Sequence, residues 1–156
     1  ADVRDMPKDA ALDIQLIGGQ PPHLYVRAGH PLAGRTHTLR EVWEYGIAVP
    51  KLLSPSKVEL AMLLGLPAGQ EASIALECDN YGVLKTVALT TDTVLGATDA
   101  AVKAELETGT LVRLAVTGWL SPPSKTGIVR LHGRTASPAA QAAIAAIVRA
   151  AQDINV

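Results

Sequence analysis

The stretch VRAGHPLAGR, Val26 to Arg35, contains the sharpest change of local pattern in the chain. A strand-like run, His23 to Arg27, leads into two glycines that bracket a His-Pro-Leu. His30 could therefore be either a catalytic general base or a structural residue of a turn. Glycine and proline here forbid a helix and favour a change of chain direction. We therefore expect the imidazole of His30 to fix a turn by hydrogen bonding.

The composition suits one globular domain or two small lobes. The 156 residues are 48% hydrophobic and 19% charged. Aromatic residues make up 3% and Phe is absent, so a core would be built from Leu, Val, Ile and Ala. The net charge is −1, with 14 basic and 15 acidic residues, and no block of Lys or Arg occurs. Because nucleic-acid binding needs clustered positive charge, this chain by itself is a poor DNA binder.

Cysteine content and hydropathy indicate the cellular compartment in which the chain is expected. Cys78 is the only cysteine, which excludes an internal disulfide and a Cys-based zinc site. No apolar run approaches the roughly 18 residues of a membrane span, and the N-terminus is not typical of a signal peptide. We therefore expect a cytoplasmic chain with no membrane association.

Short strands and helices alternate after the opening stretch. Helix starts are predicted at Ser54 or Ser56, at Asp79 or Asn80, at Asp99, and at Ser137. Strands spaced by helices of this length predict βαβ units and a mainly parallel sheet. The expected strands are Leu12–Leu16, His23–Arg27, Tyr45–Val49, Ser73–Glu77, Thr93–Thr98, Thr110–Val116 and Gly127–His132.

The helix starts predict a ligand site. In a parallel sheet the helices that follow strands begin at the carboxyl edge, where free amides and positive dipole ends meet. Ser54–Ser56, Asp79–Tyr81 and Thr98–Asp99 would meet there and offer hydroxyl, amide and backbone donors. Each polar residue could instead only cap its own helix, although capping does not exclude ligand contact. A carboxylate ligand would favour the serines and Asn80, and would avoid the two aspartates.

Catalytic and metal-binding patterns are weak. His23, His30 and His37 recur every seven residues, but no helix can form there, and on a strand an odd spacing alternates faces. A three-His metal site is therefore not expected. No G-x-S-x-G elbow or phosphate-binding loop occurs. Cys78 lies beside Asp79, whose carboxylate would lower thiol reactivity, so Cys78 is interpreted as a small hydrophobe. We expect no catalytic residues, no cofactor and no enzyme activity.

Two longer motifs resemble a known family. HLYVRAGHPLAGR followed by TLREV, and GIVRLHGRTASPAAQAAI, are similar to the two crossover regions of the effector-binding domain of LysR-type transcriptional regulators. In that family the chain leaves the first lobe through a Gly-His-Pro-Leu-Ala turn. It returns through a strand and a Gly-Arg-x-x-Ser-Pro-Ala-Ala helix start. GTLVRL (Gly109–Leu114) and the order of elements also match. The resemblance covers essentially the whole chain, and the ordered set is more specific than any one motif.

The resemblance implies an α/β fold of the type 2 periplasmic-binding-protein kind, with two Rossmann-like lobes joined by two crossover strands. Residues 1–32 and 124–156 would form the remainder of the first lobe and residues 33–123 the second, with crossovers near 26–34 and 117–128. The family's winged helix-turn-helix, linker helix and start of the first lobe have no counterpart in this sequence. We therefore expect a fragment with an incomplete first lobe and half of a ligand cleft.

The resemblance also implies a function. The chain would sense a small organic effector, often an organic acid, and alter a homodimer or homotetramer that reaches DNA only through the absent winged helix-turn-helix domain. A solute-binding protein of a transport system, which shares the fold, is the alternative. Arg27, at the first crossover, would be the one well-placed cation for an acid. By position, the other ligand-contacting residues would be Ser54, Pro55, Ser56, Asp79, Asn80, Tyr81 and Thr98.

Overall fold

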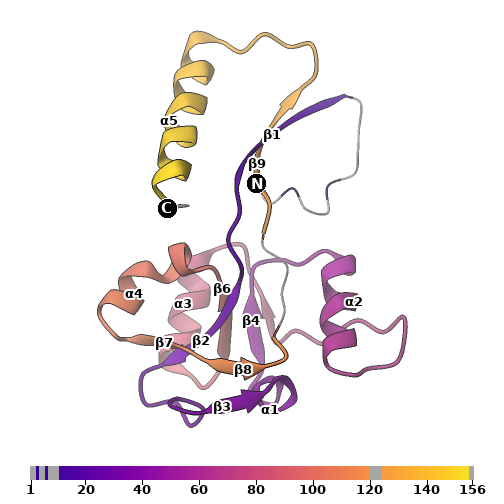
Figure 1. The fold of residues 1–156 in the computed structure, drawn as a ribbon, viewed down its shortest axis with the longest axis vertical. Helices are drawn as coiled ribbons and strands as arrows, with labels where there is room; N and C mark the ends of the chain where they lie inside the picture. Colours follow the sequence, from indigo (N-terminus) through magenta and orange to yellow (C-terminus); the bar gives the residue numbers. More distant parts are fainter. Residues whose placement is uncertain (1–2, 4–5, 7–10, 120–123, 155–156) are drawn as a thin grey trace. The chain divides into compact units, whose positions relative to one another are not determined.

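The chain forms two compact units. The computed structural model describes residues 3, 6, 11–119 and 124–154. Unit 1 comprises Ala1–Pro21 with Pro122–Val156, and unit 2 comprises Pro22–Ser121 (Figure 1). Each of the three sheets lies within one unit, so the two units are described separately.

Unit 2 is built on a five-stranded sheet with the order β5-β4-β6-β2-β7. β4 pairs in parallel with both β5 and β6, whereas β2 is antiparallel to β6 and β7. β7 therefore runs in the same direction as β6, and β2 alone is reversed, which confirms the prediction of a mainly parallel sheet. The bounds are β2 His23–Arg27, β4 Ile47–Val49, β5 Leu76–Glu77, β6 Val94–Ala97 and β7 Leu111–Arg113.

Alternate residues of the central strands supply two separate cores. In β2, Leu24 and Val26 belong to one apolar cluster, and Tyr25 between them belongs to the other. This separation follows from the two-residue period of a strand, which turns successive side chains to opposite faces. Val94 and Leu95 of β6 divide in the same way. As expected for a chain without Phe, Leu, Val, Ile and Ala make up most of both clusters.

Helices complete the two cores. Residues of α1 (Leu39–Trp43) and α2 (Ser54–Leu63) join the cluster of Leu24 and Val26. Residues of α3 (Tyr81–Thr90) and of the 3₁₀ turn η1 (Asp99–Val102) join the cluster of Tyr25, with Leu106 of α4 (Lys103–Glu107) packed against it. The sheet is thus covered by apolar helix faces on both sides, as in other α/β architectures.

The predicted strand Thr110–Val116 is interrupted. Leu114 separates β7 from β8 (Ala115–Thr117), which pairs in parallel with β3 (Thr36–Thr38) in a second, two-stranded sheet. The amide of Leu114 donates to the carbonyl of Leu24 at 2.8 Å, and its side chain is buried. The amide of this residue therefore stays hydrogen-bonded where the chain passes from one sheet to the other.

The stretch Val26–Arg35 is a turn within unit 2 and not a connection between units. β2 hydrogen-bonds to both β6 and β7, so it lies inside the sheet. Gly29 and Gly34 have φ values of 78° and 89°, the left-handed region that favours glycine. The prediction that His30 fixes this turn by hydrogen bonding is confirmed, because its ring contacts the amide of Leu32.

The compact units divide the chain elsewhere than the predicted lobes did. Residues 22–32 were expected in the first lobe, but the pairing of β2 places them in unit 2. The chain passes between units after Pro21 and after Ser121. Part of the second predicted crossover, residues 120–123, lies outside the described residues.

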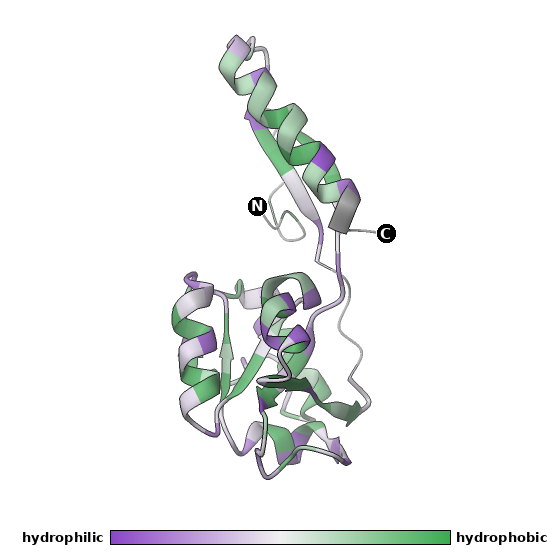
Figure 2. Cartoon of the chain, turned by 90° about the vertical axis from the view of Figure 1, so that its left-hand side faces the viewer, coloured by the Kyte–Doolittle hydropathy of each residue, from purple (hydrophilic) through white to green (hydrophobic). Residues whose placement is uncertain are grey.

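Unit 1 contains an antiparallel strand pair and one helix. β1 (Leu12–Gly18) is antiparallel to β9 (Thr126–Leu131), and α5 (Pro138–Ile154) follows. Figure 2 shows that apolar residues predominate along these elements. Much of this apolar surface is exposed, including the side chains of Ile14, Leu16, Leu131 and Ile147.

Candidate functional site

Four strands of unit 2 end at the same edge of the sheet. Because β4, β5, β6 and β7 run in the same direction, their carboxyl ends share one edge, which we call the carboxyl edge. The starts of α2, α3 and η1 follow β4, β5 and β6. The reversed strand β2 begins here, since His23 pairs with Ala97 at the end of β6. Ser54–Ser56, Asp79–Tyr81 and Thr98 therefore gather at this edge, as the sequence predicted.

The start of α2 has no side-chain cap. Leu53 is the N-cap residue, in an extended conformation, and its side chain makes no cap hydrogen bond. The predicted caps at Ser54 and Ser56 are therefore wrong, because the helix already includes both serines. Pro55 lies in the first turn, where the missing N–H of proline costs nothing. Ser56 is buried, whereas Ser54 and Pro55 are exposed.

The start of α3 is capped by Asn80, one of the two predicted caps. Its Oδ1 accepts hydrogen bonds from the amides of Gly82 at 2.9 Å and Val83 at 3.4 Å. Asp79 instead accepts a hydrogen bond from the amide of Lys51, with Oδ1 at 3.1 Å from the nitrogen. Because Lys51 lies in the loop between β4 and α2, Asp79 links the segments that precede α2 and α3.

Glu77, the last residue of β5, holds the same loop. Its Oε1 accepts from the amide of Leu52 at 3.0 Å, and its Oε2 lies 2.8 Å from the Nζ of Lys57. The hydrogen bond from Lys57, followed by that from Leu52, lowers the pKa of Glu77 below its ordinary value. Glu77 and Asp79 thus fix the approach to α2 from the neighbouring strand. Sequence reasoning missed Glu77, since its role depends on which strands are neighbours.

Asp99 links η1 to the sheet. Its Oδ1 accepts a hydrogen bond from the Tyr25 hydroxyl, and its Oδ2 pairs with the Nη2 of Arg113. Partial burial acts to raise the pKa of Asp99, but the hydrogen bonds from Tyr25 and Arg113 outweigh this effect and lower it. The N-cap position belongs to Thr98, whose side chain makes no cap hydrogen bond, so the predicted cap at Asp99 is wrong.

Two residues near this carboxylate, Tyr25 and His23, have shifted pKa values. Burial, followed by the hydrogen bond to Asp99, raises the pKa of Tyr25 far above its ordinary value. Burial, followed by the positive charge of Arg113, lowers the pKa of His23. The rings of His23 and Tyr25 meet edge to face with centroids 6.4 Å apart. At neutral pH the cluster of His23, Tyr25, Asp99 and Arg113 therefore contains one anion, one cation and two uncharged rings.

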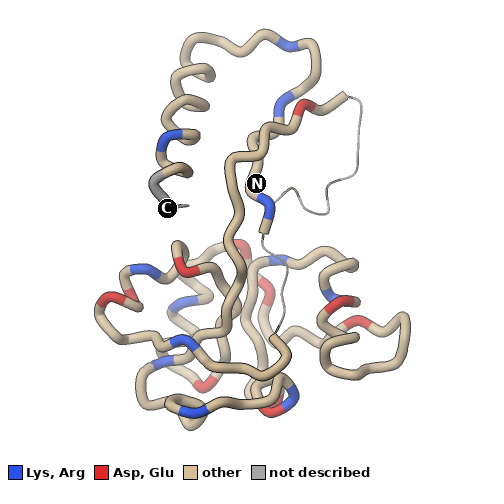
Figure 3. The backbone as a smooth tube through the Cα atoms, viewed as in Figure 1, with Lys and Arg blue, Asp and Glu red and all other residues tan. Residues whose placement is uncertain are grey.

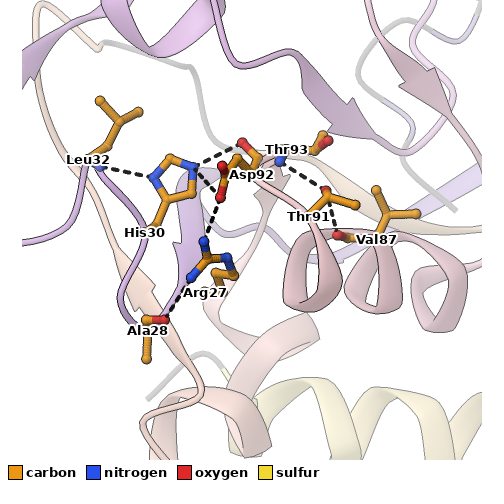
Figure 4. Close-up of polar contacts among 8 residues, drawn as sticks. All are labelled: Arg27, Ala28, His30, Leu32, Val87, Thr91, Asp92 and Thr93. Carbon is orange, nitrogen blue, oxygen red and sulfur yellow. Dashed lines mark hydrogen bonds and ion pairs between the residues drawn. The ribbon is translucent and has the colours of Figure 1, made fainter.

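Arg27 lies at the opposite edge of the sheet. It ends the reversed strand β2 and pairs with Leu111, the first residue of β7. Its Nη2 is 2.7 Å from Oδ1 of Asp92, and its Nη1 donates to the carbonyl of Ala28 at 3.3 Å (Figure 4). The structure therefore does not bring Arg27 together with the other predicted site residues. The reason is the direction of β2, which a run of alternating residues cannot reveal.

Charges of both signs are interspersed along unit 2 (Figure 3). Within the described part of the chain, no group of three or more His, Cys, Asp or Glu is placed to hold a metal ion. Over the same residues, no helix combines the length and hydropathy needed to cross a membrane.

Residues 3–152 match the family model of the LysR substrate binding domain. The chain belongs to this family. The LysR domain is also 34% identical over 146 residues to the SDS degradation transcriptional activation protein of Pseudomonas sp. (strain ATCC 19151). That match covers 91% of this chain and 46% of the relative, so the LysR domain spans less than half of the curated protein it resembles.

Solved structures confirm the predicted fold. The effector binding domain of QuiR in complex with shikimate matches the LysR domain with a TM-score of 0.69 and 13% identity, over 97% of this chain and 70% of that one. The regulatory domain of Synechocystis PCC6803 CcmR in complex with 2-PG matches with a TM-score of 0.66 and 14% identity, over 94% and 70%. The LysR domain thus has the α/β, type 2 periplasmic-binding-protein-like fold of effector-binding domains.

Proposed function

We propose that this LysR domain is the ligand-sensing regulatory domain of a transcriptional regulator. It binds a small organic effector at the carboxyl edge of unit 2. The bound effector shifts the arrangement of a DNA-bound homodimer or homotetramer in the cytoplasm, and DNA is contacted by a winged helix-turn-helix domain of the full-length protein. A ligand shifts such an equilibrium only if it binds one arrangement more tightly than the other.

One observation carries the proposal. The starts of α2, α3 and η1 lie at one edge of the sheet, and the carboxylates of Glu77 and Asp79 hold the loop before α2 in place. Such an edge supplies backbone amides and short polar side chains in a fixed arrangement, which suits recognition of a small molecule. The residues proposed to contact the effector are Ser54, Pro55, Ser56, Asp79, Asn80, Tyr81 and Thr98.

The family match favours a regulator over a solute-binding protein of the same fold. It also argues against an enzyme, because the curated relative is named as a transcriptional activation protein. The name of that relative refers to the degradation of an alkyl sulfate, and QuiR was solved with shikimate. Alkyl sulfates and small organic acids are therefore the first compounds to test as effectors.

The test uses full-length protein and ligand-dependent thermal stabilisation. Hexyl sulfate, hexanoate, 1-hexanol and shikimate form the panel, and a compound at about 100 times its Kd stabilises by about 2.7 kcal/mol. Ser54→Ala, Ser56→Ala and Asn80→Asp, the last of which can retain the helix cap, should each weaken binding about fivefold, the equivalent of about 1 kcal/mol. Thr90→Val, at the other end of α3, is the control. Full stabilisation in the three site variants would show that the effector binds elsewhere.

A further inference from the structure

We propose that Arg113 is the residue that binds the acid group of an anionic effector, with Asp99 and Tyr25 as its positioning residues. This inference rests on the proposed function, because it names a ligand class and a contact residue for the same carboxyl edge. It replaces Arg27, which lies at the other edge and is paired with Asp92.

The strand register places Arg113 at the site. Arg113 is the last residue of β7 and lies directly opposite Tyr25, so the two side chains share one face of the sheet. His23, two residues before Tyr25, shares that face and pairs with Ala97. Since Thr98 follows Ala97, Arg113 and the proposed ligand contact Thr98 belong to the same corner of the carboxyl edge.

Asp99 and Tyr25 hold the guanidinium in place. The Tyr25 side chain is fully buried in the central strand β2, so its hydroxyl is a fixed point from which Asp99 is oriented. Asp99 then pairs with Nη2 of Arg113. A pre-oriented arginine loses less side-chain entropy when a ligand binds, which increases affinity.

The guanidinium retains donors for a ligand. Arginine has five N–H donors in a planar fork, and a second carboxylate or a sulfate can bind the part that Asp99 does not use. The Arg113 side chain is 46% exposed, so its neighbours do not enclose it. From the sequence, we expected Asp99 to repel an acidic ligand. Its negative charge is compensated by Arg113 and by the Tyr25 hydroxyl, which reduces that repulsion.

The other cations of this edge are less suited. The Nζ of Lys57 lies 2.8 Å from Glu77, and its side chain is only 21% exposed. Lys51, in the loop between β4 and α2, is exposed, but a lysine ammonium is a mobile point charge without the planar fork. Lys51 is therefore the matched alternative to Arg113 in an experiment.

The experiment compares probes of equal chain length and different charge. Full-length protein is titrated calorimetrically with hexanoate, hexyl sulfate and uncharged 1-hexanol. Arg113→Gln is expected to weaken both anions at least about tenfold and to change the affinity for 1-hexanol less than about twofold. Arg113→Lys should recover part of the loss, and Lys51→Gln should change anion affinity less than about twofold. The proposal is overturned if Arg113→Gln binds the anions as well as wild type, or if Lys51→Gln causes the larger loss.

Two further variants test positioning. Tyr25→Phe keeps the buried ring and Asp99→Asn keeps the side-chain shape, and each is expected to weaken anion binding about threefold without affecting 1-hexanol. A merely structural role would weaken all three probes equally and would overturn the positioning roles. The proposed function fails in a different pattern, in which Ser54→Ala and Asn80→Asp leave every probe unaffected.

Discussion

The Nε2 atom of His30 lies 2.9 Å from the carbonyl oxygen of Asp92, and its Nδ1 atom accepts a hydrogen bond of 3.0 Å from the amide of Leu32 (Figure 4). Since Nδ1 accepts, Nε2 must carry the proton and donate, which defines the neutral tautomer. Asp92 also binds Arg27. This single residue, which precedes β6, therefore contacts both the last residue of β2 and His30 in the turn that follows. His30 has a structural role here because both of its nitrogens are engaged by the backbone.

His30→Ala is expected to lower the free energy of unfolding by about 2–4 kcal/mol, because it leaves a cavity, removes the partner of the buried Leu32 amide and breaks the hydrogen bond to the Asp92 carbonyl. Chemical denaturation measures the change. Arg27→Gln is the control, since its ion pair with Asp92 joins side chains that are 33% and 49% exposed and should contribute less than about 1 kcal/mol. An equal loss in the two variants would show that the ion pair, and not the imidazole, stabilises the turn.

Tyr25 should make the protein sensitive to alkaline pH. Burial and Asp99 raise the pKa of Tyr25, so the folded state keeps a proton that the unfolded state loses. This stabilisation is complete below about pH 10 and is lost as the pH rises further. Tyr25→Phe should lower the free energy of unfolding by about 1 kcal/mol at pH 7 and flatten its decline between about pH 10 and 12.

Urea denaturation over this pH range provides the measurement. Tyr45→Phe is a matched control, because Tyr45 is 36% exposed and its hydroxyl is no part of the Asp99 cluster. If Tyr25→Phe loses stability as steeply as wild type above pH 10, the alkaline transition belongs to another group.

Glu77→Gln should loosen the loop before α2. Glu77 accepts from the Leu52 amide, and the hydrogen bond from Lys57 lowers its pKa, so the carboxylate stabilises the fold above about pH 4.3 and less as the pH falls through the lowered value. At neutral pH the variant should accelerate amide exchange at Leu52 about fivefold or more, as measured by hydrogen–deuterium exchange. Exchange at Leu84, inside α3, is the internal control. Unchanged exchange at Leu52 would mean that Glu77 does not hold the loop.

In unit 1, the pairing of β1 with β9 should depend on pH near neutrality. Nδ1 of His132 lies 2.9 Å from Oδ1 of Asp13, and this hydrogen bond raises the pKa of His132. Its contribution is present below about pH 6.5 and is lost as the pH rises through the raised value. Asp13→Asn should shift the NMR titration of the His132 Hε1 proton to lower pH. The titration of His23 should not change, and a matching shift there would indicate a general effect on the protein.

Local sequence patterns predicted a strand or helix correctly where its bounds do not depend on neighbouring strands. His23–Arg27 was predicted with the bounds of β2, because its alternation reflects a buried strand between two cores. Ser73–Glu77 was predicted as a full strand, but only Leu76–Glu77 pairs, since β5 is an edge strand with β4 as its sole neighbour. The break at Leu114 was missed because it depends on β3, a partner far away in sequence.

The same distinction applies to the site. Asn80 was found because capping is a local property of the residues that follow it. Arg27 was expected at the first crossover, together with the other site residues, but it lies at the opposite edge of the sheet. The place of Arg113 beside Asp99 was not predicted, since both positions depend on the direction of β2. Asp99 was expected to cap η1, but it joins Tyr25 and Arg113, an interaction between three separate segments.

The place of β2 in the sheet also determines the order in which unit 2 can fold. β2 is the second strand of the chain, yet its neighbours β6 and β7 end at Ala97 and Arg113. During synthesis, Leu24 and Tyr25 must therefore wait unpaired until most of unit 2 has left the ribosome. A nascent chain that stops after Glu107 lacks one of the two neighbours of β2. We expect it to remain sensitive to protease, whereas a chain extended beyond Thr117 becomes resistant.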